Sequence, residues 1–123
     1  MLSDLEFHAT IPARDMDRAR KFYTETLGFK AEQYPGGLMM HCKDSWFLVY
    51  PTMAAGTAEH TLGGWGTDHI EQEVKDLRAR GIVFEEYDMP GLKTVNGIAN
   101  IGPDKAAWFK DSEGNILGVI QMG

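Results

Sequence analysis

The chain is predicted to adopt an α+β fold made of two successive β-α-β-β-β modules, and three observations lead to this prediction. Apolar and polar residues alternate in several short segments, as in strands with one buried face. Two other segments carry apolar residues at helical spacing. Four residues of the first half recur in the second half, each displaced by 53 residues: Asp15, Gly28, Glu32 and Tyr34 reappear as Asp68, Gly81, Glu85 and Tyr87. Internal repetition of this kind indicates a duplicated module.

The first module is predicted over residues 4–51. Alternation in residues 5–11, "LEFHATI", indicates a strand, which Pro12 ends. Asp15 can cap the helix that follows, and Gly28 suits its end. One side of this helix carries Met16, Ala19, Tyr23 and Leu27. Three strands are expected next, at 29–34, 37–43 and 45–51, the last two joined as a hairpin around Lys43, Asp44 and Ser45.

Residues 52–60 are small and polar and are interpreted as a linker, and the second module is predicted over 61–122. It opens with a glycine-weakened strand at 61–67, followed by a helix with Asp68 as its cap and Gly81 at its end. The buried side of that helix is expected to carry Ile70, Val74 and Leu77. A strand at 82–87 follows. Residues 88–104 are long and turn-rich, which suggests a lid or rim over a cavity. A hairpin of 106–111 and 116–122 closes the module around the turn "SEGN".

Composition limits the classes of function. A chain of 123 residues that is 43% hydrophobic is expected to form a single domain, residues 1–123. The net charge of −6 argues against a nucleic-acid surface, which needs clustered Lys and Arg. No apolar run is long enough to span a bilayer, and no basic-then-apolar leader is evident, so a cytoplasmic protein without a membrane partner is expected. Cys42 is the only cysteine, which excludes an internal disulfide or a thiolate cage.

Three segments carry a resemblance to a known family: "IPARDMDRARKFYTETLGF", "DHIEQEVKDLRARGIVFEEYDMPG" and "AAWFKDSEGNILGVIQ". In this order they resemble the vicinal oxygen chelate superfamily, which includes glyoxalase I, extradiol dioxygenases and bleomycin-resistance proteins. The resemblance implies that the two modules form a curled, cup-shaped mixed sheet with helices on its convex face. It also implies that ligands bind on the concave side and that the chain forms a homodimer.

The metal enzymes of this family hold a divalent ion with four side chains. The resemblance places these four positions at His8, Leu48, Leu62 and Gly118. Leucine and glycine offer no donor atom, and one imidazole cannot replace three or more nitrogen and oxygen ligands. We therefore predict no metal ligands and no cofactor. Metal-dependent lyase, isomerase or dioxygenase chemistry is disfavoured for the same reason.

His8 is the candidate catalytic residue. It shares a strand face with Glu6 and Thr10 and is expected to look into the cup, where a neutral imidazole can accept a proton near pH 7. The alternative is that His8 is a half-buried structural residue held by a hydrogen bond. The side chains expected to bind a ligand are Glu6, Thr10, Trp46, Leu48, Tyr50, Leu62 and Gly118. Phe47, Trp65 and Trp108 are expected to fill the core between sheet and helices.

The sequence leaves three functions open. The favoured one is binding of a small organic, aromatic molecule in an apolar cup without a metal, for sequestration or delivery, because missing ligands enlarge and dry the pocket. The second is a metal-free enzyme that uses His8 as a general base on a small substrate. The third is the metal-dependent chemistry already disfavoured, and glyoxalase I activity is not expected.

Overall fold

The computed structural model describes residues 1–123 and contains two open sheets, one for each module. The first sheet has the strand order β1-β4-β3-β2. Its strands are β1 (Thr10–Ala13), β2 (Lys30–Tyr34), β3 (Gly37–Cys42) and β4 (Ser45–Pro51). β1 pairs with β4 in parallel, and the other pairs are antiparallel. The crossover from β1 to β2 is α1 (Met16–Lys21) and the π-helical turn η2 (Phe22–Thr26). A short 3-10 turn, η1 (Leu2–Asp4), precedes the module.

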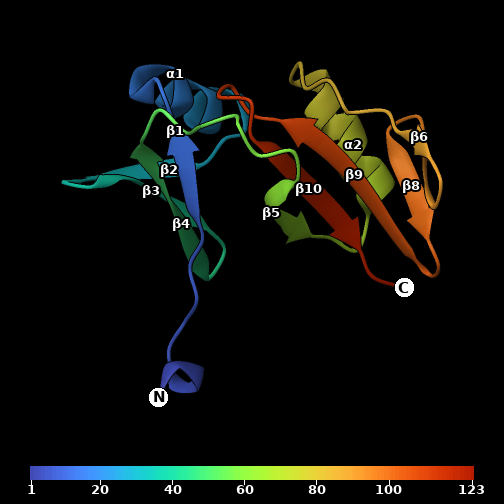
Figure 1. Ribbon diagram of the computed structural model, residues 1–123, viewed down its shortest axis with the longest axis horizontal. Helices are drawn as coiled ribbons and strands as arrows, with labels where there is room; N and C mark the ends of the chain where they lie inside the picture. Colours follow the sequence, from blue (N-terminus) through green and yellow to red (C-terminus); the bar gives the residue numbers. More distant parts are fainter.

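The second sheet has the order β5-β10-β9-β8-β7-β6. Its strands are β5 (Thr61–Gly66), β6 (Asp88–Met89), β7 (Leu92–Val95), β8 (Ile98–Ile101), β9 (Asp104–Lys110) and β10 (Ile116–Gln121). β5 pairs with β10 in parallel, and α2 (Ile70–Ala79) follows β5. Figure 1 shows the two sheets side by side, and no strand of one sheet pairs with a strand of the other. The predicted α+β fold is confirmed. None of the helices is long and apolar enough to cross a membrane.

One apolar core joins the two modules. Its 16 buried residues come from both sheets and both helices, with Tyr23 and Val49 in the first module and Val74 in the second. Trp65 packs across the boundary, because its ring stacks on Phe29 at 5.6 Å and on Phe109 at 6.3 Å between ring centroids. Burial of this aromatic surface holds the sheets together although no strands pair between them.

The predicted "SEGN" turn ties the end of the chain to the start of the first module. The Glu113 carboxylate accepts hydrogen bonds from the backbone N–H of Arg14 at 2.9 Å and of Asp15 at 2.8 Å, and from Arg18 Nε at 2.7 Å. Its side chain is 1% exposed. Burial alone would raise the pKa of Glu113, but the hydrogen bonds from Arg18, Asp15, Ser112 and Arg14 outweigh burial and lower the pKa to about 2.

Asp111 and Asn115 complete this network. The Tyr23 hydroxyl donates to Asp111 Oδ2 at 2.6 Å, and the Asn115 amide donates to the Pro12 carbonyl at 2.7 Å. Burial, and then the negative charge of Asp111, raise the pKa of Tyr23 well above its ordinary value. Tyr23 therefore remains a neutral donor across the physiological pH range. Through these hydrogen bonds the turn motif of the second module holds the first module in place.

Several expectations for the first half are confirmed. Asp15 is the N-cap of α1 and accepts a hydrogen bond from Arg18 N at 3.0 Å. The hairpin at residues 43–45 is present as the pair Cys42 and Ser45. The first strand, however, begins at Thr10 rather than at residue 5 and continues through Pro12. Pro12 is tolerated there because β1 is an edge strand, in which one row of backbone groups needs no partner.

Three expectations for the second half are wrong. Residues 82–87 form one isolated bridge, between Phe84 and Phe109, instead of a strand. Residues 88–104 do not form a lid, because β6, β7 and β8 lie within them and extend the sheet, although Val95 and Ile98 border an open groove, as expected of a rim. The turn Asn96-Gly97 has positive φ at both residues, 54° and 80°, which is the backbone of a tight hairpin.

The third wrong expectation concerns the start of α2. The helix is not capped by Asp68. Its N-cap is His69, whose side chain makes no capping bond, and the Ile70 N–H is satisfied instead by Gln121 Oε1 at 2.9 Å. An acceptor from the last strand thus replaces the local cap, which no local pattern could reveal.

Candidate functional site

His8 lies just before β1 and is held in a fixed orientation. Its Nδ1 lies 2.9 Å from the Trp46 carbonyl oxygen, and its ring stacks on the Trp46 indole at 3.6 Å between centroids and 12° between planes. A carbonyl oxygen only accepts, so Nδ1 carries the proton and Nε2 is the basic nitrogen of the neutral ring. Nε2 lies 3.4 Å from Glu6 Oε2, and the His8 side chain is 17% exposed. This arrangement is consistent with both predicted roles, the structural one and the general base.

The open face of the first sheet carries most of the predicted residues. In the β1 and β4 register, Thr10 pairs with Leu48 and Pro12 with Tyr50, so these side chains share the face of His8 and Trp46. The opposite face, with Ile11 and Val49, is buried in the core. The structure therefore brings His8, Thr10, Trp46, Leu48 and Tyr50 onto one surface.

A second histidine, which is not among the predicted site residues, lies on the same face. His41 is paired with Trp46 across β3 and β4. Its Nε2 lies 3.2 Å from Glu32 Oε2, and the same oxygen accepts from the Tyr34 hydroxyl at 3.2 Å. The negative charge of Glu32 raises the pKa of Tyr34. The signal that could have found His41 and Glu32 is strand parity relative to Trp46.

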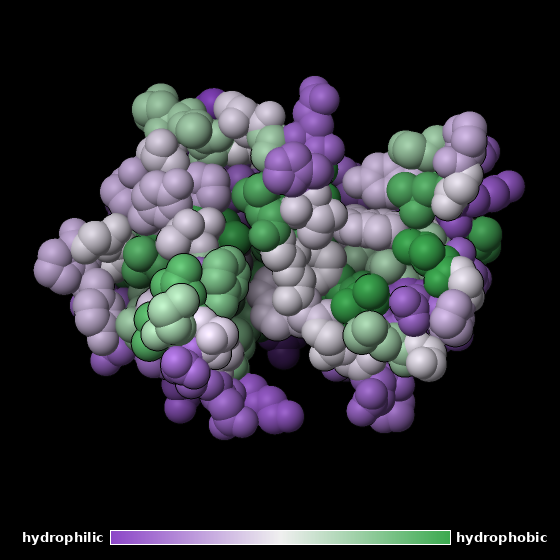
Figure 2. All heavy atoms as spheres, turned by 60° about the horizontal axis from the view of Figure 1, so that its bottom comes forward, coloured by the Kyte–Doolittle hydropathy of each residue, from purple (hydrophilic) through white to green (hydrophobic).

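Leu62 lies elsewhere, in an open groove between the edge strands of the two sheets. This seam groove has a volume of about 520 Å³. It is bounded by the start of β1, the turn between β3 and β4, and β5, and Figure 2 shows apolar residues on both sides of the furrow between the two lobes. Its lining comprises Phe7, Ala9, Ile11, Cys42, Lys43, Ser45, Trp46, Phe47, Leu62, Gly63, Gly64, Trp65, Gly66 and Leu117. Trp46 thus reaches both the open face of the first sheet and the seam groove.

Gly118 lies on the open face of the second sheet. A methyl group at this position would contact Trp108 Cδ1 at 3.4 Å and Thr61. Trp108 packs edge-on against Tyr87, at 5.6 Å between centroids, and borders an open groove of about 550 Å³. The expectation that Trp108 fills the core is therefore wrong, because Gly118 and Trp108 occupy the opposite face to Leu117 and Phe109.

Within one chain, the predicted site residues lie in three separate places. His8, Thr10, Trp46, Leu48 and Tyr50 lie together, Glu6 lies beside His8, Leu62 lines the seam groove and Gly118 belongs to the second sheet. No group of three His, Cys, Asp or Glu residues is arranged to hold a metal ion. His8 with Leu48, Leu62 and Gly118 does not supply the donor set of the family's metal centre.

Two repeated modules, each with an open sheet and a helix against it, define a protein of the vicinal oxygen chelate type. Residues 7–119 match the family model described as the Glyoxalase/Bleomycin resistance protein/Dioxygenase superfamily, and the chain belongs to this family. The resemblance noted in the sequence is confirmed. A glyoxylase-like domain-containing protein of Didymella fabae is 28% identical over 111 residues, which cover 85% of this chain and 84% of that protein.

Solved structures agree on the fold. UcmS2 superimposes with a TM-score of 0.72 at 20% identity, covering 92% of this chain and 94% of that one. A glyoxalase/bleomycin resistance protein/dioxygenase from Alicyclobacillus acidocaldarius gives a TM-score of 0.70 at 22% identity, with 97% and 92% covered. TnmS3, an antibiotic binding protein from Streptomyces sp. CB03234, gives 0.64 at 20% identity, with 97% and 98% covered. At these identities the similarity establishes the fold alone.

Proposed function

We propose that the protein binds a small organic molecule with a flat, aromatic body in the seam groove, for sequestration or delivery. The observation that carries the proposal is the lining of this groove, where Trp46 from the first module and Trp65 from the second border a space of about 520 Å³. Lys43 is the only charged side chain in the lining. Apolar and aromatic walls with few polar groups are typical of sites for organic ligands.

The walls are rigid, which favours binding. Trp46 is stacked on His8, and Trp65 is stacked between Phe29 and Phe109. Little side-chain freedom remains to be lost when a ligand binds. Burial of about 200 Å² of aromatic surface contributes about 5 kcal/mol, and aromatic contacts with the two indoles, edge-on at Trp65, add about 2 kcal/mol. These contacts support a dissociation constant no tighter than about 10 µM.

The relatives are consistent with this proposal. TnmS3 is described as an antibiotic binding protein and shares the fold. Binding of a small ligand by this chain requires neither a metal nor a catalytic step. This agrees with the lack of donor atoms at Leu48, Leu62 and Gly118.

The predicted site residues that do not line the seam groove are proposed to contribute in a homodimer. β1 and β5 are the edge strands of their sheets, and each leaves one row of backbone groups without a strand partner. A second copy placed against these edges would also enclose the seam groove. In the cup that the resemblance implies, Gly118 of one chain would then approach His8, Glu6, Thr10, Leu48 and Tyr50 of the other. We also propose a cytoplasmic location and a single domain, residues 1–123, in which residues 52–60 link the two modules.

The test is a titration of tryptophan fluorescence with a panel of aromatic metabolites and antibiotics. Gly63 lines the groove, and a Cβ atom added there meets no other atom within 4 Å. Gly63→Leu should fill the groove and weaken binding at least about tenfold without loss of stability. Gly36→Leu is the matched control, because Gly36 is equally open and lies in the turn before β3. Equal binding by both variants would exclude the seam groove.

An enzyme with His8 as a general base is the second candidate, because the bond from Nδ1 to the Trp46 carbonyl leaves Nε2 free to accept a proton. His8→Ala distinguishes the two proposals. Sequestration predicts stoichiometric binding that survives the substitution. Base catalysis predicts turnover that falls by about 10²- to 10⁴-fold.

A further inference from the structure

The N-terminal arm, residues 1–8, carries large apolar side chains that the rest of the chain does not cover. Leu2 is 84% exposed, Leu5 68% and Phe7 92%. Figure 1 shows the N-terminus projecting away from both sheets. Single exposed apolar residues are ordinary, but several together on a projecting segment indicate a surface that another molecule covers.

The arm is also amphipathic. Asp4 ends the 3-10 turn η1 and the chain is extended from Leu5, so Leu5 and Phe7 share one side of the arm and Glu6 lies on the other. A surface that receives this segment needs an apolar floor and a positively charged rim.

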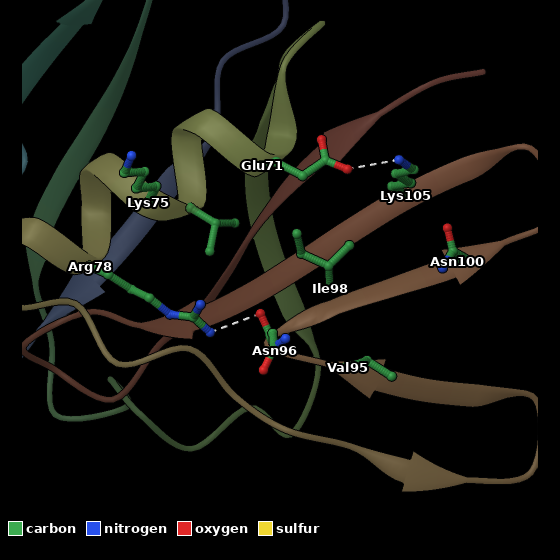
Figure 3. A pocket seen from close by; sticks show the side chains of 9 residues that line it. Glu71, Lys75, Arg78, Val95, Asn96, Ile98, Asn100 and Lys105 are labelled. Atoms are coloured by element: carbon green, nitrogen blue, oxygen red, sulfur yellow. Dashed lines mark hydrogen bonds and ion pairs between the residues drawn. The ribbon is translucent and has the colours of Figure 1, made fainter.

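One groove of the protein has this character. The helix–sheet groove lies between α2 and strands β7 to β9, has a volume of about 450 Å³ and is shown in Figure 3. Its floor is formed by Val74, Val95 and Ile98. Val95 is exposed although it lies in a strand, so the floor is open to a partner.

The rim of the helix–sheet groove is positive, although the chain as a whole has a net charge of −6. Lys75, Arg78 and Lys105 line it, against the single carboxylate of Glu71. Figure 3 shows Lys105 paired with Glu71, at 2.8 Å, and Arg78 held by the Asn96 carbonyl, also at 2.8 Å. Lys75 has no ion pair within the chain. The groove therefore keeps an excess of positive charge.

We propose that residues 4–7 of a second copy of this chain lie in the helix–sheet groove, in a reciprocal exchange of arms across a two-fold axis. Leu5 and Phe7 pack on the floor, and the Glu6 carboxylate reaches the positive rim. The helix from Glu71 to Arg78 is roughly 10 Å long, which matches about three extended residues. Reciprocal exchange closes the assembly as a dimer. This inference rests on the proposed homodimer and adds a second contact to it. Phe7 also lines the seam groove, so the tests below measure association of the two chains without any ligand.

Sedimentation velocity over a range of protein concentrations tests the role of the arm. The double variant Leu5→Ser and Phe7→Ser should raise the dimer dissociation constant at least about tenfold. Val83→Ser is the matched control, because Val83 is 82% exposed and lies outside the groove, and it should leave the constant unchanged. A monomeric wild-type protein, or a dimer unaffected by the double variant, overturns the proposal.

Cysteine cross-linking tests the place where the arm binds. In a Cys42→Ser background, a Leu5→Cys protein is mixed with a Val95→Cys protein under mild oxidation, and the products are identified by mass. The expected product is the heterodimer that joins the two variants. A mixture with Val83→Cys in place of Val95→Cys should give little of it. Equal yields with both partners, or cross-links between two arms only, overturn the assignment. Because no ligand is used, failure here is distinct from failure of the proposed ligand binding.

Discussion

Glu113 gives the sharpest prediction about stability, because a single atomic exchange removes its charge. Glu113→Gln keeps the shape of the side chain but replaces a charged acceptor that binds two backbone amides and Arg18. The pKa of Glu113 is lowered from 4.5 to about 2 in the folded chain. A shift of this size corresponds to about 3 kcal/mol, which we discount to about 2–3 kcal/mol because Arg18 is half exposed and screened by solvent.

The sign of the pH dependence follows from the lowered pKa. The carboxylate stabilises the fold fully above pH 4.5, and this contribution is lost as the pH falls from 4.5 towards 2. Urea unfolding of both proteins should therefore show a difference of about 2–3 kcal/mol at pH 7 and roughly half or less of that at pH 3. The other carboxyl groups titrate in both proteins and cancel. A difference that is absent at pH 7, or that does not shrink at pH 3, would show that the charge of Glu113 does not stabilise the fold.

Two further predictions concern buried contacts. Tyr23→Phe removes the donor to Asp111 and should lower the free energy of unfolding by about 1.5–3 kcal/mol, measured by urea unfolding at pH 7; a loss below about 0.5 kcal/mol would show that the bond contributes little. Gly64→Ala should cost about 1–3 kcal/mol in the same assay, because its methyl group would collide with the Gly118 carbonyl, whereas Gly63→Ala should be tolerated; similar losses for the two variants would contradict the close approach of β5 to β10 at Gly64.

The sequence predicts the parts of the fold that depend on local patterns. The strands near 37–43 and 45–51 and the Asp15 cap depend on residues close together in the chain, and the structure confirms them. The start of α2 could not be predicted, because Gln121 from the last strand replaces the cap expected from Asp68. The hairpin at Asn96-Gly97 carried a recognisable turn signal that the composition of residues 88–104 obscured.

The sequence could predict which candidate site residues lie together only within one sheet. Strand parity correctly groups Thr10, Trp46, Leu48 and Tyr50, because side chains two residues apart share a face. Parity does not fix how two separate sheets are placed relative to each other. For this reason the sequence could not show that Leu62 lines the seam groove while Gly118 lies beneath Trp108.

The most direct test of ligand binding in the seam groove follows the three indole N–H signals by NMR during titration with an aromatic ligand found in the fluorescence screen. Trp46 and Trp65 line the groove, whereas Trp108 borders the open face of the second sheet. Binding in the seam groove should move the signals of Trp46 and Trp65 together, with saturation at one ligand per chain, while that of Trp108 stays in place. Movement of the Trp108 signal alone would exclude binding in the seam groove.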